Sequence, residues 1–238
     1  MGISDIDVAV LAGGLGTRLQ AVLPETPKIL APIGGKPFLE HLLGWLSRQG
    51  AHRILLCLGY RAGHVRAFLQ EHSFPELDIE TIVEPEPLGT GGAVAFALPH
   101  LRTDPVLVMN GDTIVDVDLN AFLAAHTTSG TDASVLCVPV EDAARYGRLE
   151  IDANRQRVIR FAEKDSSAAG SAWINGGIYL FGGKVFDGIA RLTKGSLERD
   201  VLEKMPAGSI HAFQTEGRFL DIGTPETLAL APEVLTPL

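Results

Sequence analysis

The sequence contains no apolar run long enough to cross a membrane as a helix. Its longest apolar stretches, such as Arg53–Gly59 and Val106–Met109, have the length of strands, whereas a spanning helix needs roughly 20 apolar residues. The N-terminus also lacks the basic segment that precedes the apolar core of a secretory signal. These absences predict a cytoplasmic protein with no membrane partner.

Cysteine and clustered basic residues are scarce as well. The two cysteines, Cys57 and Cys137, lie inside apolar runs, where a cysteine usually behaves as a small buried hydrophobe. Neither a disulfide nor a cysteine-bound metal is therefore expected. The formal net charge is −9 with no prominent cluster of Lys and Arg, which argues against a nucleic-acid partner. A small polyanion stays compatible, because it needs only a local pocket of cations.

The first half of the sequence alternates segments typical of strands with segments typical of helices. The expected strands are residues 7–11, 53–59, 79–83, 105–110 and 133–140. Helices are expected between them, near residues 38–46, 65–69 and 92–98. Strand, helix and strand recur at about 25 to 30 residues, near the length of a βαβ unit. This pattern predicts an α/β fold with a Rossmann-like, mixed and mostly parallel sheet flanked by helices.

The second half has a different pattern. Two hairpin-like strands, 147–151 and 158–163, are joined by a turn-rich segment, which predicts a small antiparallel layer over the first half. After them we expect an apolar strand, two short helices and a final strand pair, at 173–181, 185–192, 197–204 and up to residue 223. The whole chain, 1–238, is expected to form a single domain.

A glycine-rich loop, residues 11–19, directly follows the first expected strand. Open α/β sheets place ligands at this end of their strands, and glycines there let backbone N–H groups close on an anion. Neither common motif fits, because a dinucleotide fingerprint would need glycine at Leu19 and a Walker A loop would need Gly-Lys-Ser/Thr at 16–18. Arg18 and Lys28 instead supply two cations that could converge on one polyphosphate.

This loop, Gly14-Leu15-Gly16-Thr17-Arg18-Leu19, followed by Pro27-Lys28 and Ala31-Pro32, resembles the signature of the sugar-1-phosphate nucleotidyltransferase family. The resemblance implies an enzyme with the nucleotide-diphospho-sugar transferase type of fold, in which the loop cradles a nucleoside triphosphate. It implies catalytic roles for Arg18, at the pyrophosphate leaving group, and for Lys28, near the α-phosphorus. Residues 84–92, Glu-Pro-Glu-Pro-Leu-Gly-Thr-Gly-Gly, are similar to the family's base-recognition segment. The nucleotide-binding residues implied are Leu11, Ala12, Gly13, Gly14, Gly16, Thr17, Glu84, Gly89 and Thr90.

The same resemblance implies Mg²⁺ as the cofactor. The apolar strand before Asn110-Gly111-Asp112 and the later Asp221-Ile222-Gly223-Thr224-Pro225 look like the two elements that hold the metal in the family. Asp112, also counted as catalytic, and Asp221 would then be its ligands. Two carboxylates together with phosphate oxygens suit the octahedral oxygen shell of magnesium.

Elements of the second half resemble the family's acceptor site. They are Tyr146-Gly147, Phe161–Lys164 and Ile174–Tyr179, and the sugar-phosphate-binding residues implied are Asn110, Gly147, Glu163, Lys164 and Asn175. Lys164 would hold the phosphate, although Asp165 replaces the proline that the family commonly has next. Residues 1–140 would mainly bind the nucleotide, and residues 141–238 mainly the sugar phosphate.

Several segments look most like the D-glycero-D-manno-heptose 1-phosphate guanylyltransferases, among them 36–39, 87–93, 110–113 and 196–198. The resemblance implies GTP and D-glycero-α-D-manno-heptose 1-phosphate as substrates, GDP-heptose for surface glycans as product, and a minimal enzyme without a repeat-rich extension. Mannose-1-phosphate guanylyltransferase, glucose-1-phosphate thymidylyl- or uridylyltransferase and N-acetylmuramate-1-phosphate uridylyltransferase are the alternatives within the class. The sequence leaves open whether the protein forms a homo-oligomer.

Two alternatives come from other classes. A catalytically silent subunit that binds nucleotide sugars would have no need of Arg18, Lys28, Asp112 and Asp221 together. A glycosyltransferase on a similar fold would favour an Asp-x-Asp metal motif, which residues 116–118 match. Because these residues lie past the strand end, Asp118 is better interpreted as a helix cap.

Overall fold

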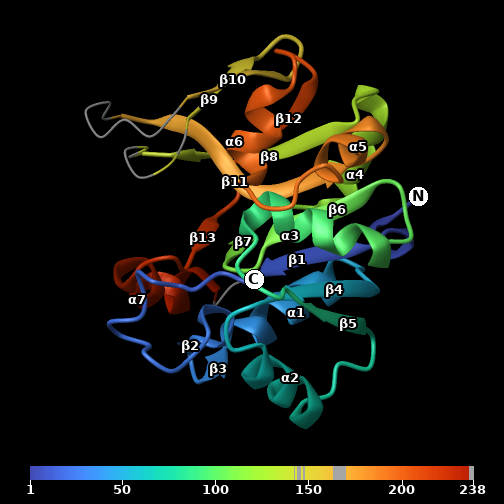
Figure 1. The fold of residues 1–238 in the computed structure, drawn as a ribbon. Helices are drawn as coiled ribbons and strands as arrows, with labels where there is room; N and C mark the ends of the chain where they lie inside the picture. The colour runs from blue at the N-terminus through green and yellow to red at the C-terminus, as the bar shows by residue number, and fades with distance from the viewer. Residues whose placement is uncertain (142, 144–145, 147, 163–169, 236–238) are drawn as a thin grey trace.

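The fold centres on one large mixed sheet (Figure 1). The computed structural model describes residues 1–141, 143, 146, 148–162 and 170–235. Within this part of the chain, the sheet has nine strands in the order β5-β4-β1-β6-β11-β8-β12-β10-β9. In chain order they are β1 (Val8–Ala12), β4 (Arg53–Leu58), β5 (Asp78–Val83), β6 (Val106–Asn110), β8 (Ala133–Val140), β9 (Arg148–Asp152), β10 (Arg157–Ala162), β11 (Ala172–Phe181) and β12 (Ile210–Gln214).

Most strands of this sheet point the same way. Strands β5, β4, β1 and β6 pair in parallel, and β12 is parallel to β8. Of the strands described, only β10 and β11 run against the rest, since every antiparallel pair contains one of them. The predicted α/β class with a mixed, mostly parallel sheet is therefore confirmed.

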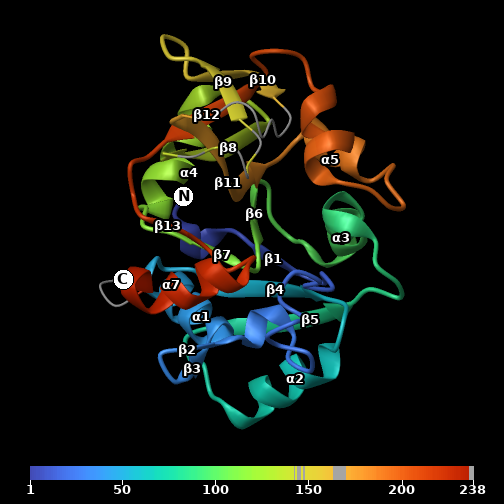
Figure 2. The ribbon, with the colours of Figure 1, turned by 90° about the vertical axis from the view of Figure 1, so that its left-hand side faces the viewer.

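Helices cover both faces of the sheet (Figure 2). Those of the described chain are α1 (Phe38–Arg48), α2 (Ala62–Glu71), α3 (Gly89–Ala97), α4 (Leu119–Ser129), α5 (Lys184–Ile189), α6 (Leu197–Asp200) and α7 (Pro225–Leu235). Side chains alternate along a strand, so Val8 and Val10 belong to a core cluster with apolar residues of α1, α2, α4 and α7, whereas Ala9 belongs to a cluster with residues of α3, α5 and α6. Short 3₁₀ turns complete the set at Ile3–Asp5, Lys28–Leu30, Leu98–His100 and Leu202–Lys204.

Local sequence signals explain several boundaries. The apolar stripe of α1 is fully buried at Phe38, Leu42 and Leu46, as expected for an amphipathic helix on a sheet. The Asp118 carboxylate accepts hydrogen bonds from the backbone N–H groups of Asn120 and Ala121, at 2.8 and 3.1 Å. Asp118 therefore is the helix cap that the sequence predicted, at the start of α4.

The predicted antiparallel layer is wrong in its placement. Strands β9 and β10 do form a hairpin, but β10 also pairs with β12, so the hairpin extends the edge of the large sheet instead of covering it.

The final two strands do not pair with each other either. Strand β12 is buried within the sheet beside β8, because its apolar residues need cover on both faces. Strand β13 (Phe219–Asp221) pairs with β7 (Thr113–Val115), and β2 (Pro32–Ile33) with β3 (Lys36–Pro37).

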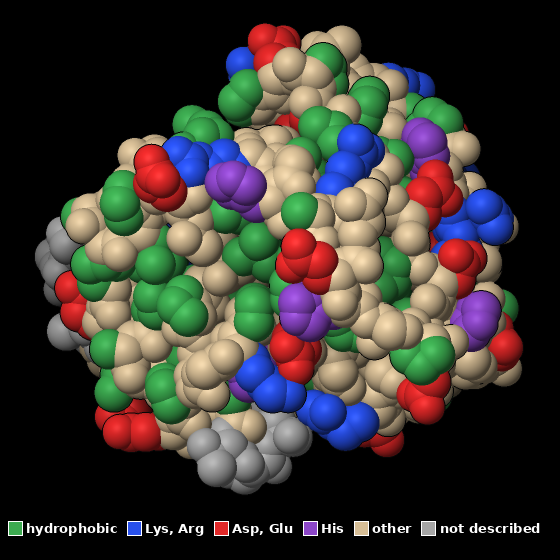
Figure 3. All heavy atoms as spheres, turned by 90° about the horizontal axis from the view of Figure 1, so that it is seen from below, with side chains coloured by type: hydrophobic (Ala, Val, Ile, Leu, Met, Phe, Trp, Pro, Cys, Tyr) green, Lys and Arg blue, Asp and Glu red, His purple; other side chains and the backbone are tan. Residues whose placement is uncertain are grey.

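The cysteines and the helix lengths can be described in the same terms as the sequence. Both cysteines are free and buried, and burial raises the pKa of the Cys57 thiol to about 12. Within the described residues, no helix is long and apolar enough to span a membrane. On the face shown in Figure 3, acidic and basic side chains are interspersed.

Candidate active site

A cavity of about 500 Å³ opens at the carboxyl ends of β1, β5 and β6. The loops after these three strands form its wall, as expected for a ligand site in an open α/β sheet. Every residue predicted to bind the nucleotide lines this cavity, as do Arg18, Lys28 and Asp112. We call it the first cavity.

Cationic side chains from the first loop and its continuation converge at one point of this cavity. The ammonium group of Lys28 hydrogen-bonds to Oδ2 of Asp112 and lies 3.9 Å from Oδ1 of Asp221. A Cβ atom added to Gly223 would lie 3.2 Å from both Nη2 of Arg18 and Nζ of Lys28. The absence of a side chain at Gly223 therefore lets both cations reach the same place, next to two carboxylates.

A small antiparallel strand pair brings the two carboxylates together. Asp112 lies two residues after the end of β6, and the next residue, Thr113, pairs with Asp221 of β13. The backbone N–H of Ile222 also donates to the carbonyl oxygen of Asp112, at 3.0 Å. Burial raises the pKa of Asp221, the nearby Asp112 charge raises it further, and Lys28 opposes both effects. The site thus places two carboxylates next to the two cations Arg18 and Lys28.

The donor set of Asp112 and Asp221 fits Mg²⁺. Both are oxygen ligands, and their mutual repulsion would be relieved by a divalent cation. The described residues contain no group of three or more His, Cys, Asp and Glu able to hold a metal ion, so substrate or water would have to supply further ligands. Magnesium commonly binds in this way, through one or two carboxylates plus phosphate oxygens.

Glu84 forms a buried acidic part of the first cavity. It follows β5, has 8% of its surface exposed, and its Oε2 accepts a hydrogen bond from the N–H of Leu88 at 3.0 Å. A Cβ on Gly13 would lie 2.5 Å from Oε1 of Glu84, so only glycine at residue 13 leaves room for this carboxylate. Burial raises the pKa of Glu84.

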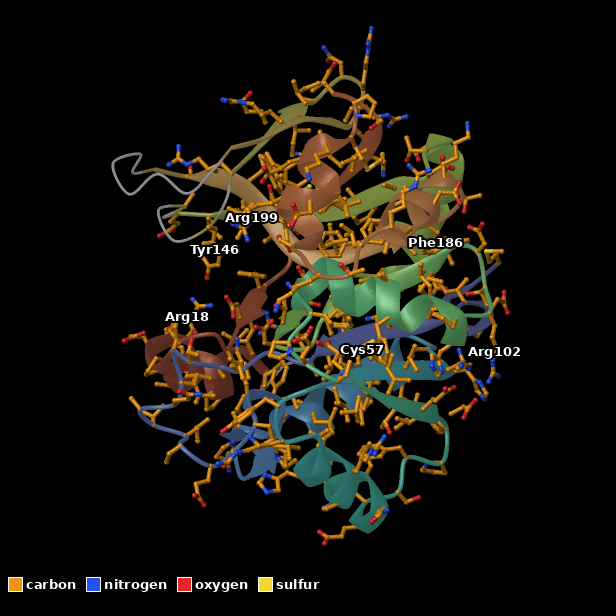
Figure 4. All side chains as sticks on the ribbon, viewed as in Figure 1. Arg18, Cys57, Arg102, Tyr146, Phe186 and Arg199 are labelled. Atoms are coloured by element: carbon orange, nitrogen blue, oxygen red, sulfur yellow. The ribbon has the colours of Figure 1, made fainter. Side chains whose placement is uncertain are left out.

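A second cavity, of about 720 Å³, adjoins the first. The two share Arg18, Thr90, Asn110 and Asp112. Of the residues predicted for the sugar phosphate, Asn110 and Asn175 line the second cavity, while Gly147, Glu163 and Lys164 lie outside the described residues. In Figure 4, Arg18, Tyr146 and Arg199 lie along the same side of the molecule, where this second cavity opens.

Sequence analysis missed several residues of the second cavity. Arg148, Glu198 and Arg199 line it, and the buried Tyr179 hydroxyl lies beneath it, 3.1 Å from Oε1 of Glu198. The segment 196–198 drew notice only as part of a resemblance. Its serine gave a local signal, since Ser196 caps α6 by accepting from the N–H of Arg199.

The Asp-x-Asp alternative finds no support in this geometry. Asp118 caps α4, and Asp116 lies 3.4 Å from Nη2 of Arg218. Neither aspartate is among the described residues that line the two cavities.

Comparison with known proteins assigns this arrangement to a class. The family model described as nucleotidyl transferase matches residues 8–236, and the chain belongs to this family. Among its relatives is D-glycero-alpha-D-manno-heptose 1-phosphate guanylyltransferase of Aneurinibacillus thermoaerophilus, 33% identical over 97% of this chain and 98% of that protein. Mannose-1-phosphate guanylyltransferase of Mycobacterium tuberculosis is 34% identical over 95% of this chain but only 63% of its own length. The crystal structure of HddC from Yersinia pseudotuberculosis complexed with GMP-PN superposes with a TM-score of 0.84, at 37% identity, covering 96% of this chain and 98% of that one.

Proposed function

We propose that the protein transfers a guanylyl group from GTP to D-glycero-α-D-manno-heptose 1-phosphate, forming GDP-heptose and pyrophosphate. The observation that carries this proposal is the convergence of Arg18 and Lys28 on two carboxylates where two cavities meet. A transferase for two phosphorylated substrates needs such a place, since each substrate occupies one cavity and the reacting phosphorus lies between them. The relative from Aneurinibacillus, matched over nearly its whole length, supports the choice of heptose.

The reaction is an in-line attack by the sugar-phosphate oxygen on the α-phosphorus of GTP. A new bond forms between that oxygen and the α-phosphorus, the bond to the β-phosphate oxygen breaks, and pyrophosphate leaves with the electron pair. A phosphate monoester is already anionic near neutral pH, so no strong general base is needed. The chain must instead bring two anions together and stabilise the developing charge.

The described residues divide this work. Arg18 can grip the β- and γ-phosphates bidentately, and Lys28 neutralises charge at the α-phosphate. Asp112 and Asp221 would hold Mg²⁺, which when bound supplies further neutralisation of the phosphate oxygens. Asn175 binds sugar hydroxyls, and we extend the proposal to Lys164 as the residue that holds the acceptor phosphate. A cytoplasmic location, where nucleoside triphosphates are abundant, is part of the same proposal.

Glu84 supports guanine as the base. An ionised carboxylate only accepts hydrogen bonds, and guanine presents two adjacent donors, N1–H and the exocyclic amine, along one edge. We expect Glu84→Gln to raise the KM for GTP about 10-fold, because the amide turns one acceptor into a donor. Relative activity with ATP should rise, since adenine offers an acceptor at N1. Unchanged base preference in this variant would remove Glu84 from base recognition.

The decisive test measures pyrophosphate release for GTP, ATP, UTP and dTTP against heptose, mannose and glucose 1-phosphates and N-acetylmuramate 1-phosphate. The highest kcat/KM is expected for GTP with the manno-configured heptose. Product from UTP or dTTP but not GTP would exclude the guanylyl assignment, and a preference for mannose 1-phosphate would move the protein to the second group of relatives. No release with any pair, under conditions where nucleotide sugars bind, would indicate a silent binding subunit.

A further inference from the structure

One carboxylate of the second cavity's lining accepts hydrogen bonds from three hydroxyl groups. Glu198, at the start of α6, accepts from Tyr179 through Oε1, at 3.1 Å. Its Oε2 accepts from Thr90 and Ser196, at 3.2 and 2.8 Å. Thr90 lines both cavities and belongs to α3, whereas Tyr179 belongs to β11. Glu198 thus connects the nucleotide side of the site with the acceptor side.

The direction of these hydrogen bonds follows from the chemistry of the groups. A carboxylate only accepts, and a hydroxyl has one proton to donate. Each hydroxyl that donates to Glu198 must therefore accept from its other neighbour. The other neighbours are all N–H groups: Leu197 N–H reaches Thr90 at 2.8 Å, Arg199 N–H reaches Ser196 at 3.3 Å, and Asn175 Nδ2 reaches Tyr179 at 2.7 Å.

This direction determines how Asn175 faces the second cavity. Its Nδ2 is turned to Tyr179, and its Oδ1 accepts from the N–H of Gly177 at 2.9 Å. The second proton on Nδ2 is then left as a donor for a sugar oxygen. Tyr179 keeps its own proton, because full burial, followed by the Glu198 charge, raises the pKa of its hydroxyl well above the usual value.

The same carboxylate constrains Thr90 in the first cavity. The single proton of the Thr90 hydroxyl points to Glu198, so this hydroxyl has no proton for a phosphate oxygen. It can offer only an acceptor to a bound molecule. The backbone holds the two elements in place as well, since the N–H of Gly91 in α3 donates to the carbonyl oxygen of Gly195 at 2.9 Å.

We propose that Glu198 is a positioning residue that orients the Asn175 amide toward the acceptor sugar and the Thr90 hydroxyl toward the nucleotide, so that one side chain prepares both substrate sites. This inference rests on the proposed function for the names of the two substrates. Glu198 itself acts through Tyr179 and Thr90. The effect of replacing it should accordingly divide into two parts, each carried by a different hydroxyl.

Steady-state kinetics of three variants tests this division. Glu198→Gln keeps the size but introduces a donor, and we expect it to raise the KM for both substrates about 10-fold with a smaller change in kcat. Tyr179→Phe should raise the KM for the sugar 1-phosphate alone. Thr90→Val changes a residue that lines both cavities, and it should raise the KM for the nucleotide more than the KM for the sugar 1-phosphate. Combining Glu198→Gln with Tyr179→Phe should raise the acceptor KM no further than Glu198→Gln does, as expected for residues in one chain of hydrogen bonds.

Controls separate the positioning role from a loss of fold. Glu71→Gln, on the distant helix α2, makes the same chemical change and should leave both KM values as in the wild type. If Glu198→Gln changes both KM values by less than twofold, or if Tyr179→Phe and Thr90→Val each affect both substrates equally, the inference is wrong. Equal losses of melting temperature and activity in all variants would likewise reduce Glu198 to a structural role.

A second measurement is independent of the enzymatic assay. In ¹⁵N-labelled protein, the side-chain amide of Asn175, assigned by its loss in Asn175→Asp, should show one proton protected from solvent exchange. That protection should disappear in Glu198→Gln and Tyr179→Phe. If the protection of the Asn175 amide proton is the same in these variants as in the wild type, the inference is wrong, even if the wild type turns over GTP. If the wild type has no activity, the proposed function is refuted, but this test of Glu198 stays valid.

Discussion

The two cavities are built in different ways. The first is formed mainly by short loops that follow parallel strands, so most of its residues occur in compact groups at 11–18, 84–93 and 110–112, with Lys28, Ile29 and Gly223 in addition. The second collects residues from β6, β7, β9, β10, β11, α6 and β13 together with Arg18 and Thr90, so its lining extends from residue 18 to residue 221. Parallel strands deliver their ends to one edge, whereas an antiparallel region builds a site through register and crossing elements. If the two cavities are built separately, replacing a residue that lines both should impair turnover, and replacing a residue of one cavity should affect one substrate.

The largest effect is expected at a residue that both cavities share. Asp112→Asn should lower kcat about 10³-fold, or about 4 kcal/mol, because a carboxylate next to the reacting phosphorus is lost. The Mg²⁺ concentration for half-maximal activity should rise. Asp116→Asn makes the same change four residues later, where the aspartate pairs with Arg218, and should keep near wild-type rates. An equal loss in both variants would revive the Asp-x-Asp alternative.

Arg18 is also shared, and the proposed reaction assigns it to the leaving group. We expect Arg18→Ala to lower kcat about 10²-fold with a smaller change in the KM for the sugar 1-phosphate. Arg66→Ala, on α2, serves as the control for loss of a surface cation. A purely structural role for Arg18 would appear as a lower melting temperature with unchanged turnover of the folded fraction.

Gly13 belongs only to the first cavity, so its replacement should affect one substrate. In Gly13→Ala the added methyl group collides with Glu84, and the KM for GTP should rise about 10-fold through displacement of this carboxylate. The KM for the sugar 1-phosphate should change little. Gly63→Ala in α2, where a Cβ meets open space, is the matched control. Equal changes in both KM values would mean that the cavities are not separable in this way.

The smallest effect concerns stability and contrasts two buried clusters. His211, near Ser134 and His126, is held neutral: burial lowers its pKa to about 4. Between pH 6.5 and about 4 this imidazole is protonated in the unfolded chain but neutral in the folded chain. The free energy of unfolding should therefore be lower by about 1–2 kcal/mol at pH 5 than at neutral pH. Thermal unfolding as a function of pH measures this, and His211→Gln should flatten the curve in that window.

The other cluster lies at the amino ends of the parallel strands and responds at lower pH. Arg53 lies 3.0 Å from Asp7 and 2.7 Å from Glu80. The hydrogen bond from His100, followed by the Arg53 interaction, lowers the pKa of Glu80. The stabilisation from this carboxylate is complete above its ordinary pKa and is lost only as pH falls below it. Acidification should therefore weaken the His211 region before the Arg53 region.

The residues of the first cavity could be predicted from the sequence more completely than those of the second. Arg18, Glu84 and Asp112 follow recognisable strands within a few residues, and Lys28 belongs to the Pro27-Lys28 motif, so local pattern and motif were sufficient to place them. Strand β11 shows the opposite case. An irregularity between Asn175 and Tyr179 changes its register against β8, and Gly177 there has a positive φ of 71°. Nothing in the local sequence states where such a shift directs the neighbouring side chains.

Long-range contacts explain the remaining failures. Glu198 reaches Thr90 only because α6 packs against α3, 108 residues earlier in the chain. The hairpin β9–β10 has the alternation of a separate layer, but pairing with β12 determines its place. Hydrophobic alternation predicts that a strand has a buried face and does not specify its neighbour.

The short strand β13 is not part of the large sheet, yet it carries Asp221 into the site. All nine strands of the large sheet, in the part of the chain described, end by Gln214. Asp221 arrives afterwards, on three residues that pair only with β7 among the described strands. The second acidic group is thus an addition to a completed scaffold, and mutation of this late segment could silence transfer while the nucleotide loops persist.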